Sequence, residues 1–525
     1  MSLRSPRGSV VRVFLLLVGS RIVRLLLASC LASGLTVIIV LLLAGDLGTR
    51  AVKPFVAQPV FAAPALVSMQ TLSSSYPNCH FGAGQVRQSV MSYSAPSLNL
   101  GWYLNWGTLV SPPTPGGMEY VQTLRVSSGG YSPSGVALAE RIAANPGALW
   151  LIGNEPDCIY QDNVLPQVYA QVYHDAYTFI KGLDPAARVA VGGIVQPTPL
   201  RMQYLDIVLD AYAALYGEPL PTDAWNIHIF ILREASCAPE SPYKDSCWGA
   251  EIPPGIAVYH GMLYTLDDID RQDIFQQRIG QFRQWMKDRG YHDKPLIITE
   301  YGTLLPYYDP GSLYYDSQGH PFDEARARDF MYGTFDFLLT ASDPGAGYPA
   351  DENRLVQRWL WYSLDDTSYG GALFDPFTAA TLTLGTNLGT YTSELFPVVD
   401  LLAVDVRQVG PVPYSPTSAA TVTLQVRVSN VGNVAITQPV VVRFLDGEGH
   451  QIGADQVISG AVPGCAEVRW AAMVWPNVAP GAHAVHVVVD PIGAIGEGNE
   501  SNNETYGVAL VAKARVLMPL LVRGK

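Results

Sequence analysis

Ala148-Leu149-Trp150-Leu151-Ile152-Gly153-Asn154-Glu155-Pro156-Asp157 is a short apolar run that ends abruptly in polar residues. This pattern is typical of a buried strand that emerges into a loop. Pro156 cannot donate a ladder hydrogen bond, so strand pairing is expected to stop where Glu155 appears. The stretch therefore predicts a strand over residues 149–153 that carries a carboxylate at its C-terminal end.

The same pattern recurs in Lys294-Pro295-Leu296-Ile297-Ile298-Thr299-Glu300-Tyr301-Gly302. Two parallel strands of a barrel would bring Glu155 and Glu300 to one rim. Paired carboxyl groups there suit the cleavage of a glycosidic bond, with one as proton donor and the other as nucleophile. The alternative is that each glutamate forms a structural ion pair. Two such motifs in one chain favour the catalytic interpretation.

Composition limits the class of protein. A chain of 525 residues is too long for one ordinary domain, and 48% apolar residues can form a large core. A formal net charge of -13 argues against a nucleic-acid partner. The 28 tyrosines and 10 tryptophans suit stacking on sugar rings and ordinary cores equally well, so they do not decide between the two.

The six cysteines show no metal-ligand spacing. Cys237 and Cys247 lie in one loop and are expected to form a local disulfide. Cys79 with Cys158 is a less specific second pair, which leaves Cys465 unpaired and Cys30 in the N-terminal apolar segment. Disulfides require an oxidising compartment.

The N-terminal region predicts export. Residues 1–24 contain five arginines and no acid, and residues 25–45 contain no charge and are long enough to span a bilayer as a helix. The basic residues place the N-terminus on the cytoplasmic side. A cleaved signal peptide is the alternative, since Ala62-Ala63-Pro64-Ala65 resembles a cleavage site. Its distance from the apolar run favours an anchor, followed by a spacer over residues 46–78.

Apolar segments alternate with helical patterns over residues 79–395. Helical spacing is clear over residues 168–183 and 270–290, and a loop with a last helix is expected over 370–391. This alternation predicts a TIM-type (β/α)8 barrel. The expected strands are 79–84, 99–106, 120–126, 149–153, 188–194, 224–231, 295–299 and 358–363.

The periodicity changes near residue 400. Val422, Leu424, Val426 and Val428 alternate with polar residues and share one face of a strand. Further strands are expected over residues 440–445 and 484–489. This pattern predicts an immunoglobulin-like β-sandwich over residues 400–512, followed by a tail over 513–525.

Residues 79–395 resemble the clan A glycoside hydrolases, and in particular the glycosyl hydrolase catalytic core group that includes glycoside hydrolase family 128. The matching motifs are Gly101-Trp102-Tyr103-Leu104-Asn105-Trp106, Leu151-Ile152-Gly153-Asn154-Glu155-Pro156-Asp157, Trp225-Asn226-Ile227-His228 and Pro295-Leu296-Ile297-Ile298-Thr299-Glu300-Tyr301. The resemblance implies a retaining β-glucanase in which Glu155 is the general acid/base and Glu300 is the nucleophile.

Further residues are expected to bind the substrate. Asn154 would donate to the sugar 2-hydroxyl or, alternatively, cap its loop; His228 would lie beside the nucleophile. Trp361 would form a sugar platform or pack in the core. Tyr103, Asn105, Trp106 and Tyr301 complete the expected set, of which at least one of the first three should line the cleft.

The C-terminal region resembles the CARDB family, whose modules serve as spacers or binding units on cell surfaces. The matching motifs are Val426-Arg427-Val428-Ser429-Asn430-Val431-Gly432-Asn433 and Val489-Asp490-Pro491 followed by Gly498-Asn499-Glu500-Ser501-Asn502-Asn503. These residues suit turns, and a calcium site formed by Asp490, Glu497 and Glu500 is an open alternative.

These features predict an exported, membrane-anchored or secreted retaining glycoside hydrolase that cleaves a β-linked polysaccharide, with β-1,3-glucan favoured by the resemblance. No cofactor, metal or nucleic acid is expected. Contact with a cell surface or cell wall is possible through the C-terminal domain. The alternatives are another β-glycanase, such as a mannanase or xylanase, and a non-catalytic glycan-binding adhesin. The long insertion over residues 232–268 would reshape the cleft, so linkage specificity does not transfer safely.

Overall fold

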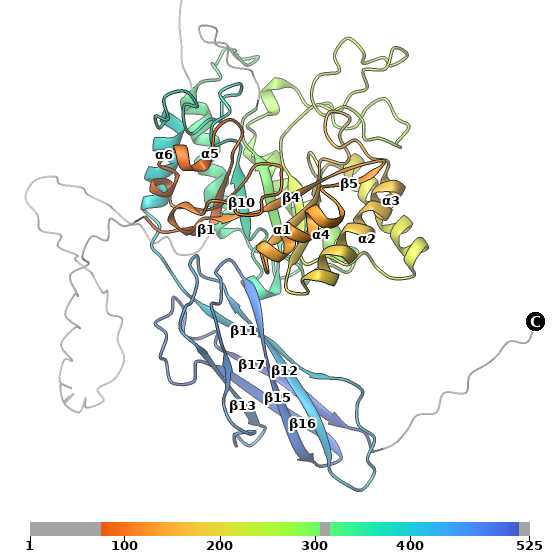
Figure 1. Ribbon diagram of the computed structural model, residues 1–525, viewed down its shortest axis with the longest axis vertical. Helices are drawn as coiled ribbons and strands as arrows, with labels where there is room; N and C mark the ends of the chain where they lie inside the picture. Colours follow the sequence, from red (N-terminus) through yellow and green to blue (C-terminus); the bar gives the residue numbers. More distant parts are fainter. Residues whose placement is uncertain (1–74, 305–314, 514–525) are drawn as a thin grey trace, which may run out of the picture. The chain divides into compact units, whose positions relative to one another are not determined.

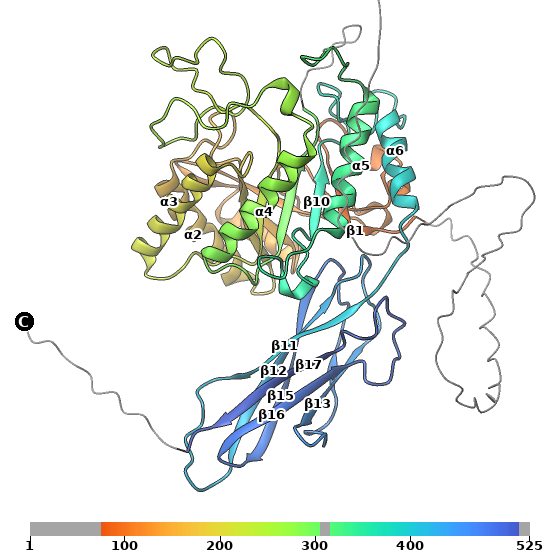
Figure 2. The same ribbon diagram turned by 180° about the vertical axis from the view of Figure 1, so that it is seen from behind.

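The computed structural model describes residues 75–304 and 315–513 (Figures 1 and 2). The predicted anchor over residues 25–45, the spacer up to residue 74 and the tail from residue 514 lie outside the described residues. Within the described ranges, no helix combines the length and the apolar character that crossing a bilayer requires.

The first folded region is an α/β domain. Its strands are β1 (Asn78–Gly84), β2 (Leu100–Leu104), β3 (Glu119–Tyr120), β4 (Gln122–Ser127), β5 (Gly130–Ser132), β6 (Leu149–Asn154), β7 (Arg188–Gly193), β8 (Trp225–His228), β9 (Leu296–Tyr301) and β10 (Arg358–Trp361). Its helices are α1 (Gly135–Ala144), α2 (Pro166–Leu183), α3 (Pro199–Tyr216), α4 (Gln272–Asp288), α5 (Glu324–Thr340) and α6 (Thr383–Ser393). Strands and helices alternate from α1 onwards, whereas β1, β2 and β3 are joined only by loops and short 3-10 turns.

Most neighbouring strands of this domain are parallel and are consecutive, or nearly so, in the sequence. One sheet has the order β3-β2-β1-β10-β9-β8, and a second has the order β5-β4-β6-β7, in which only β5 is antiparallel. Val121 alone separates β3 from β4, and the parallel bridges Ala190–Ala224 and Ile194–Ile227 link the β7 segment to the β8 segment. Because all these strands except β5 are parallel, their C-terminal ends meet at one rim.

The central strands are buried on both faces, as their unbroken apolar sequences require. All residues of β6 and β9 are buried, including the polar residues at their C-terminal ends. Helix α2 buries Tyr169, Tyr173 and Ile180 on one stripe, which is the spacing expected from the sequence. The intervals that α1, α3 and α5 occupy had no specific helix prediction.

The second folded region is a β-sandwich. Its strands are β11 (Leu401–Val409), β12 (Ala420–Asn430), β13 (Val440–Asp446), β14 (Gln456–Ile458), β15 (Glu467–Val478), β16 (Gly481–Val489) and β17 (Glu504–Val511). They form the antiparallel sheets β11-β12-β15 and β14-β13-β16-β17. Val422, Leu424, Val426 and Val428 all point into its core, as the alternation predicts.

The disulfides differ in part from the prediction. Cys237 and Cys247 are bonded, with an S–S distance of 2.12 Å. Cys79 is bonded to Cys465 at 2.07 Å, so its predicted pairing with Cys158 is wrong, and Cys158 is a buried free thiol. The partners are 386 positions apart in the sequence, which is why no local pattern indicated them.

Candidate active site

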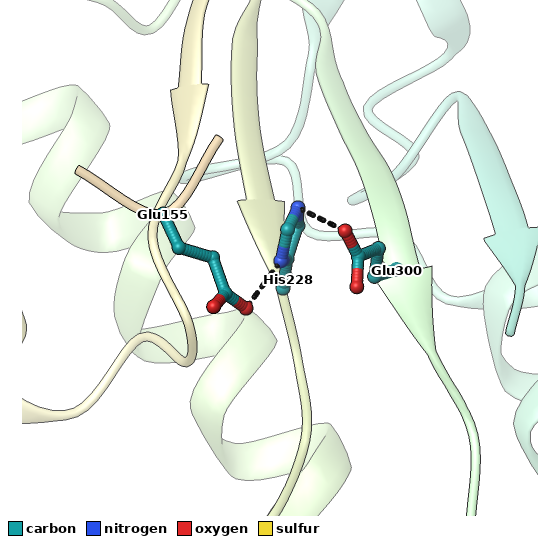
Figure 3. A group of neighbouring side chains, drawn as sticks. All are labelled: Glu155, His228 and Glu300. Carbon is teal, nitrogen blue, oxygen red and sulfur yellow. Dashed lines mark hydrogen bonds and ion pairs between the residues drawn. The ribbon is translucent and has the colours of Figure 1, made fainter. Parts of the chain in front are cut away.

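Three predicted residues meet at the C-terminal ends of neighbouring strands. Glu155 directly follows β6, His228 ends β8, and Glu300 lies near the end of β9. Figure 3 shows the imidazole of His228 between the two carboxyl groups. Its Nδ1 lies 2.8 Å from Oε1 of Glu155, and its Nε2 lies 3.5 Å from Oε1 of Glu300.

The two carboxyl groups lie close together. The facing oxygens of Glu155 and Glu300 lie within 4.8 Å of one another, and each residue is 7% exposed. A retaining glycosidase places its two carboxyl groups about 5–5.5 Å apart, whereas an inverting one separates them by about 6.5–9.5 Å to admit a water molecule. An upper limit of 4.8 Å between the facing oxygens lies below the separation of an inverting pair.

Trp106 makes a direct contact with Glu300. Its indole Nε1 donates to Oε1 of Glu300 at 2.5 Å. Trp106 follows the end of β2 with a φ of 57°, which is unusual for a bulky side chain. An N–H donor favours the charged form of the carboxylate that accepts it. This contact therefore stabilises an ionised Glu300.

Burial opposes that ionisation. It raises the pKa of Glu300 to about 7, and the charge of Glu155 adds to the rise, whereas His228 and the Trp106 N–H act in the other direction. For His228, burial lowers the pKa, but the two carboxylates outweigh it and the net shift is upward. The protonation of His228 and that of Glu300 are therefore coupled.

Asp162 holds the loop after β6 in place through hydrogen bonds. Its Oδ2 accepts hydrogen bonds from the backbone N–H groups of Asn154 at 2.7 Å and Val126 at 3.1 Å. Its Oδ1 accepts from Nε of Arg125 at 2.6 Å. The backbone of Glu155, which has a φ of 45°, donates to the carbonyl of Gly193 at 2.9 Å. These bonds set the direction in which Glu155 projects.

Glu155 and Glu300 line a cleft with a volume of 370 Å³. One wall is aromatic and includes Trp106, Phe230 and Tyr362, while Arg125 and Asn154 contribute polar groups. An apolar wall with a few polar groups is usual for ligand sites. The remaining lining residues are Val86, Glu155, Cys158, Tyr160, Gln161, Val195, Leu232, Gly249, Ala250, Glu300, Leu304 and Tyr369.

Several predicted binding residues lie elsewhere. Trp361 is 1% exposed and donates its N–H to the carbonyl of Gly371, so it does not form the sugar platform. Tyr301 is fully buried and packs edge-on against Trp361, so it packs in the core, which was the alternative to a role in binding. Alternation along the strand explains both results, because the neighbours Tyr362 and Glu300 face the cleft instead.

The second strand shows the same alternation. Tyr103 is fully buried and donates to the carbonyl of Pro113, and Asn105 accepts a hydrogen bond from Tyr120. Neither side chain lines the cleft, so only Trp106 of the three has the predicted position. Phe230, two residues beyond His228, and Arg125, near the end of β4, were missed. Both follow from the rule that strand-end residues at this rim face the site.

Metal binding depends on the same residues. Among the described residues, Glu155, His228 and Glu300 form the only group of three or more acidic, histidine or cysteine side chains whose ligand atoms come this close together. Asp490, Glu497 and Glu500, the alternative calcium ligands, do not form such a group. Hydrogen bonds join His228 to Glu155 and Trp106 to Glu300.

Comparison with known proteins gives similarities for both folded regions. Residues 400–507 match the CARDB family model. The CARDB resemblance predicted from the sequence is thereby confirmed. The CARDB domain is also similar to that of a protein from Pyrococcus furiosus, with 19% identity, a TM-score of 0.19 and coverage of 22% of this chain and 91% of that one. No curated protein matches the sequence.

The solved structures similar to the α/β domain include members of glycoside hydrolase family 128, the family of the predicted resemblance. One is a subgroup II endo-β-1,3-glucanase from Sorangium cellulosum, with 17% identity, a TM-score of 0.37 and coverage of 59% of this chain and 98% of that one. Another is a subgroup I endo-β-1,3-glucanase from Amycolatopsis mediterranei in complex with laminaritriose, with 15% identity, a TM-score of 0.39 and coverage of 59% and 99%.

Proposed function

We propose that the protein is a retaining glycoside hydrolase that cleaves a β-linked glucan, with its site at the C-terminal rim of a (β/α)8 barrel. The observation that carries the proposal is the approach of the Glu155 and Glu300 oxygens to within 4.8 Å across one cleft. The choice of β-1,3-glucan follows the sequence resemblance to family 128.

In the proposed mechanism, Glu300 attacks the anomeric carbon while Glu155 gives its proton to the departing glycosidic oxygen. The Trp106 N–H favours the ionised form of Glu300, which supports its role as nucleophile. The mechanism requires one proton on the pair before attack, held by Glu155, so that Glu300 is the free carboxylate. Water then enters, Glu155 removes its proton, and the covalent bond to Glu300 is hydrolysed.

The purified protein should release reducing sugar from β-1,3-glucan, and Glu155→Gln and Glu300→Gln should each abolish that release. A panel that also contains β-mannan and β-xylan identifies the linkage. If the wild-type protein binds a glucan but releases no sugar from any of these polymers, it is a glycan-binding protein rather than an enzyme.

Azide separates the two roles. With an activated aryl β-glucoside, Glu155→Ala should yield the β-glucosyl azide, because azide attacks the glycosyl-enzyme from the face that Glu155 has vacated. Glu300→Ala should yield the α-anomer, because azide then replaces the nucleophile itself. The opposite pair of configurations would mean that the roles are exchanged.

We also propose that the protein acts outside the cytoplasm, either membrane-anchored or secreted. The basic and apolar segments over residues 1–45 support export, and so do the disulfides Cys79–Cys465 and Cys237–Cys247. Protease digestion of intact cells, followed by detection of the CARDB domain, tests this location.

A further inference from the structure

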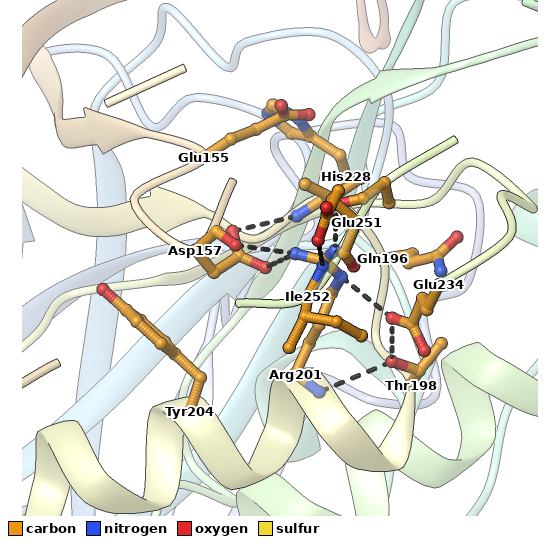
Figure 4. A network of polar contacts seen from close by, with 12 residues as sticks. Glu155, Asp157, Gln196, Thr198, Arg201, Tyr204, His228, Glu234, Glu251 and Ile252 are labelled. Carbon is orange, nitrogen blue, oxygen red and sulfur yellow. Dashed lines mark hydrogen bonds and ion pairs between the residues drawn. The ribbon is translucent and has the colours of Figure 1, made fainter. Parts of the chain in front are cut away.

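Arg201 is a completely buried arginine behind the candidate site, in the first turn of α3. Figure 4 shows its guanidinium at the centre of a polar network. Its Nε donates to Glu234 at 2.9 Å, its Nη1 donates to the carboxylate and the carbonyl of Asp157 at 2.6 and 2.9 Å, and its Nη2 donates to the carbonyls of Ala250 and Glu251 at 2.6 and 3.0 Å. An arginine has five N–H donors, so every one is used.

One side of this network is the segment that carries Glu155. Asp157 lies two residues after Glu155 and is fully buried. Besides Arg201, its carboxylate accepts the backbone N–H of Val195 at 3.3 Å, just beyond β7. Asp157 therefore ties the chain after Glu155 to both α3 and β7.

The other side is the insertion between β8 and α4. The carboxylate of Glu234 accepts from the hydroxyl of Thr198 at 2.6 Å and from the backbone N–H of Met262 at 2.8 Å, so it closes the base of the insertion. The carboxylate of Glu251 accepts from the backbone N–H of Cys237 at 2.5 Å, beside the disulfide to Cys247. The insertion is thus held in one shape.

This insertion forms part of the cleft. Leu232, Gly249 and Ala250 line it, and Arg201 holds the carbonyl of Ala250 directly. Gln196 fixes the start of the insertion by exchanging two hydrogen bonds with the backbone of Leu232, at 2.8 and 2.9 Å. The same guanidinium therefore holds a cleft wall and the segment bearing the proposed proton donor.

We propose that Arg201 is a positioning residue for the hydrolysis: it fixes Glu155 and the wall formed by Leu232, Gly249 and Ala250 in one relative position. The inference rests on the proposed function. A misplacement of about 1 Å at a reacting group can lower a rate about a hundredfold. Loss of Arg201 should therefore impair proton donation by Glu155 more than it impairs substrate binding.

The test is Arg201→Lys, which keeps the positive charge but has a single nitrogen in place of the planar fork. Arg283→Lys is the matched control, since Arg283 is equally buried and donates to the carbonyls of Ala346 and Lys294 at 3.1 and 2.9 Å. Each variant is assayed on β-1,3-glucan and on a dinitrophenyl β-glycoside of the same sugar, whose leaving group needs no proton. Thermal melting measures folding.

We expect Arg201→Lys to lower kcat/KM on the polysaccharide about a hundredfold and kcat/KM on the dinitrophenyl substrate less than about tenfold, because kcat/KM excludes the later step in which Glu155 acts as a base. Arg283→Lys should lower the melting temperature and leave both kcat/KM values unchanged. If Arg201→Lys does not fold, Glu234→Gln provides the same comparison, because it removes a charge but keeps an acceptor for Arg201; a smaller loss with the same substrate dependence is expected.

Equal losses on the two substrates in a folded variant, or no loss, would overturn the positioning role. Failure of the proposed function has a different signature, since the wild-type protein would then release nothing from either substrate.

Discussion

Replacing Trp106 with phenylalanine should move the acidic limb of the pH–activity profile to higher pH. The substitution keeps an aromatic ring in the cleft wall and removes the N–H that donates to Glu300 at 2.5 Å. That donor lowers the pKa of Glu300, which burial raises so strongly that it is about 7 with the donor in place. Without it the carboxyl stays protonated to higher pH, and a protonated carboxyl cannot attack the anomeric carbon.

The magnitude follows from the bond that is lost. A hydrogen bond to a charged group contributes about 1.5–3 kcal/mol, and one pKa unit corresponds to about 1.36 kcal/mol. The acidic limb should therefore rise by about one to two pH units. The assay is kcat/KM on β-1,3-glucan as a function of pH, which reports the ionisation of the free enzyme.

Trp361→Phe is the matched control, because Trp361 is also a buried tryptophan but donates to the carbonyl of Gly371. It should lower stability and leave the acidic limb in place. An unshifted limb in Trp106→Phe, or equal shifts in the two variants, would refute the proposed stabilisation of Glu300.

Three further predictions test other features of the site. Glu300→Gln should raise the melting temperature at about pH 8 more than at about pH 4. The pKa of Glu300 is raised from 4.5 to about 7 in the folded protein, chiefly by burial. The free energy of unfolding therefore falls as the pH rises through that interval, by up to about 3 kcal/mol, and the glutamine variant avoids this loss. Tyr362→Ala should raise KM for the glucan by about tenfold with a smaller change in kcat, because it removes an aromatic face that packs edge-on against Phe230 in the cleft wall. Incubation with EDTA should leave kcat unchanged, because the proposed reaction uses only the two carboxyl groups. A loss that zinc or calcium restores would make the triad a metal site.

The sequence predicted the elements that carry a strong local signal. The strand predicted over residues 149–153 lies within β6, and the one predicted over 295–299 overlaps β9, because parallel strands buried on both faces must be apolar throughout. The meeting of Glu155 and Glu300 followed from the common direction of parallel strands. His228 could be placed for the same reason, since it ends β8 beside them.

The residues that were misplaced differ from the correct ones by a single step along a strand. Trp361 was expected in the cleft and Tyr362 was not considered, although consecutive side chains face opposite sides. Composition cannot settle such a choice, because both residues are aromatic and both faces of the strand are buried. The wall from the insertion, held by Arg201, depends on contacts between residues far apart in the sequence and had no local signal.

The backbone at the site indicates how its geometry is maintained. Glu155 and Trp106 both adopt positive φ, at 45° and 57°, a conformation that costs about 1–3 kcal/mol for residues other than glycine. Both positions project a side chain towards Glu300, whose burial also opposes its charge. The unfavourable φ angles and the buried charge would each favour a rearrangement of the site if the surrounding structure allowed it. The buried bonds of Asp162 to Asn154 and of Arg201 to Asp157 oppose that relaxation, and they lie outside the reacting groups. These supporting hydrogen bonds therefore keep the carboxyl groups of Glu155 and Glu300 close together.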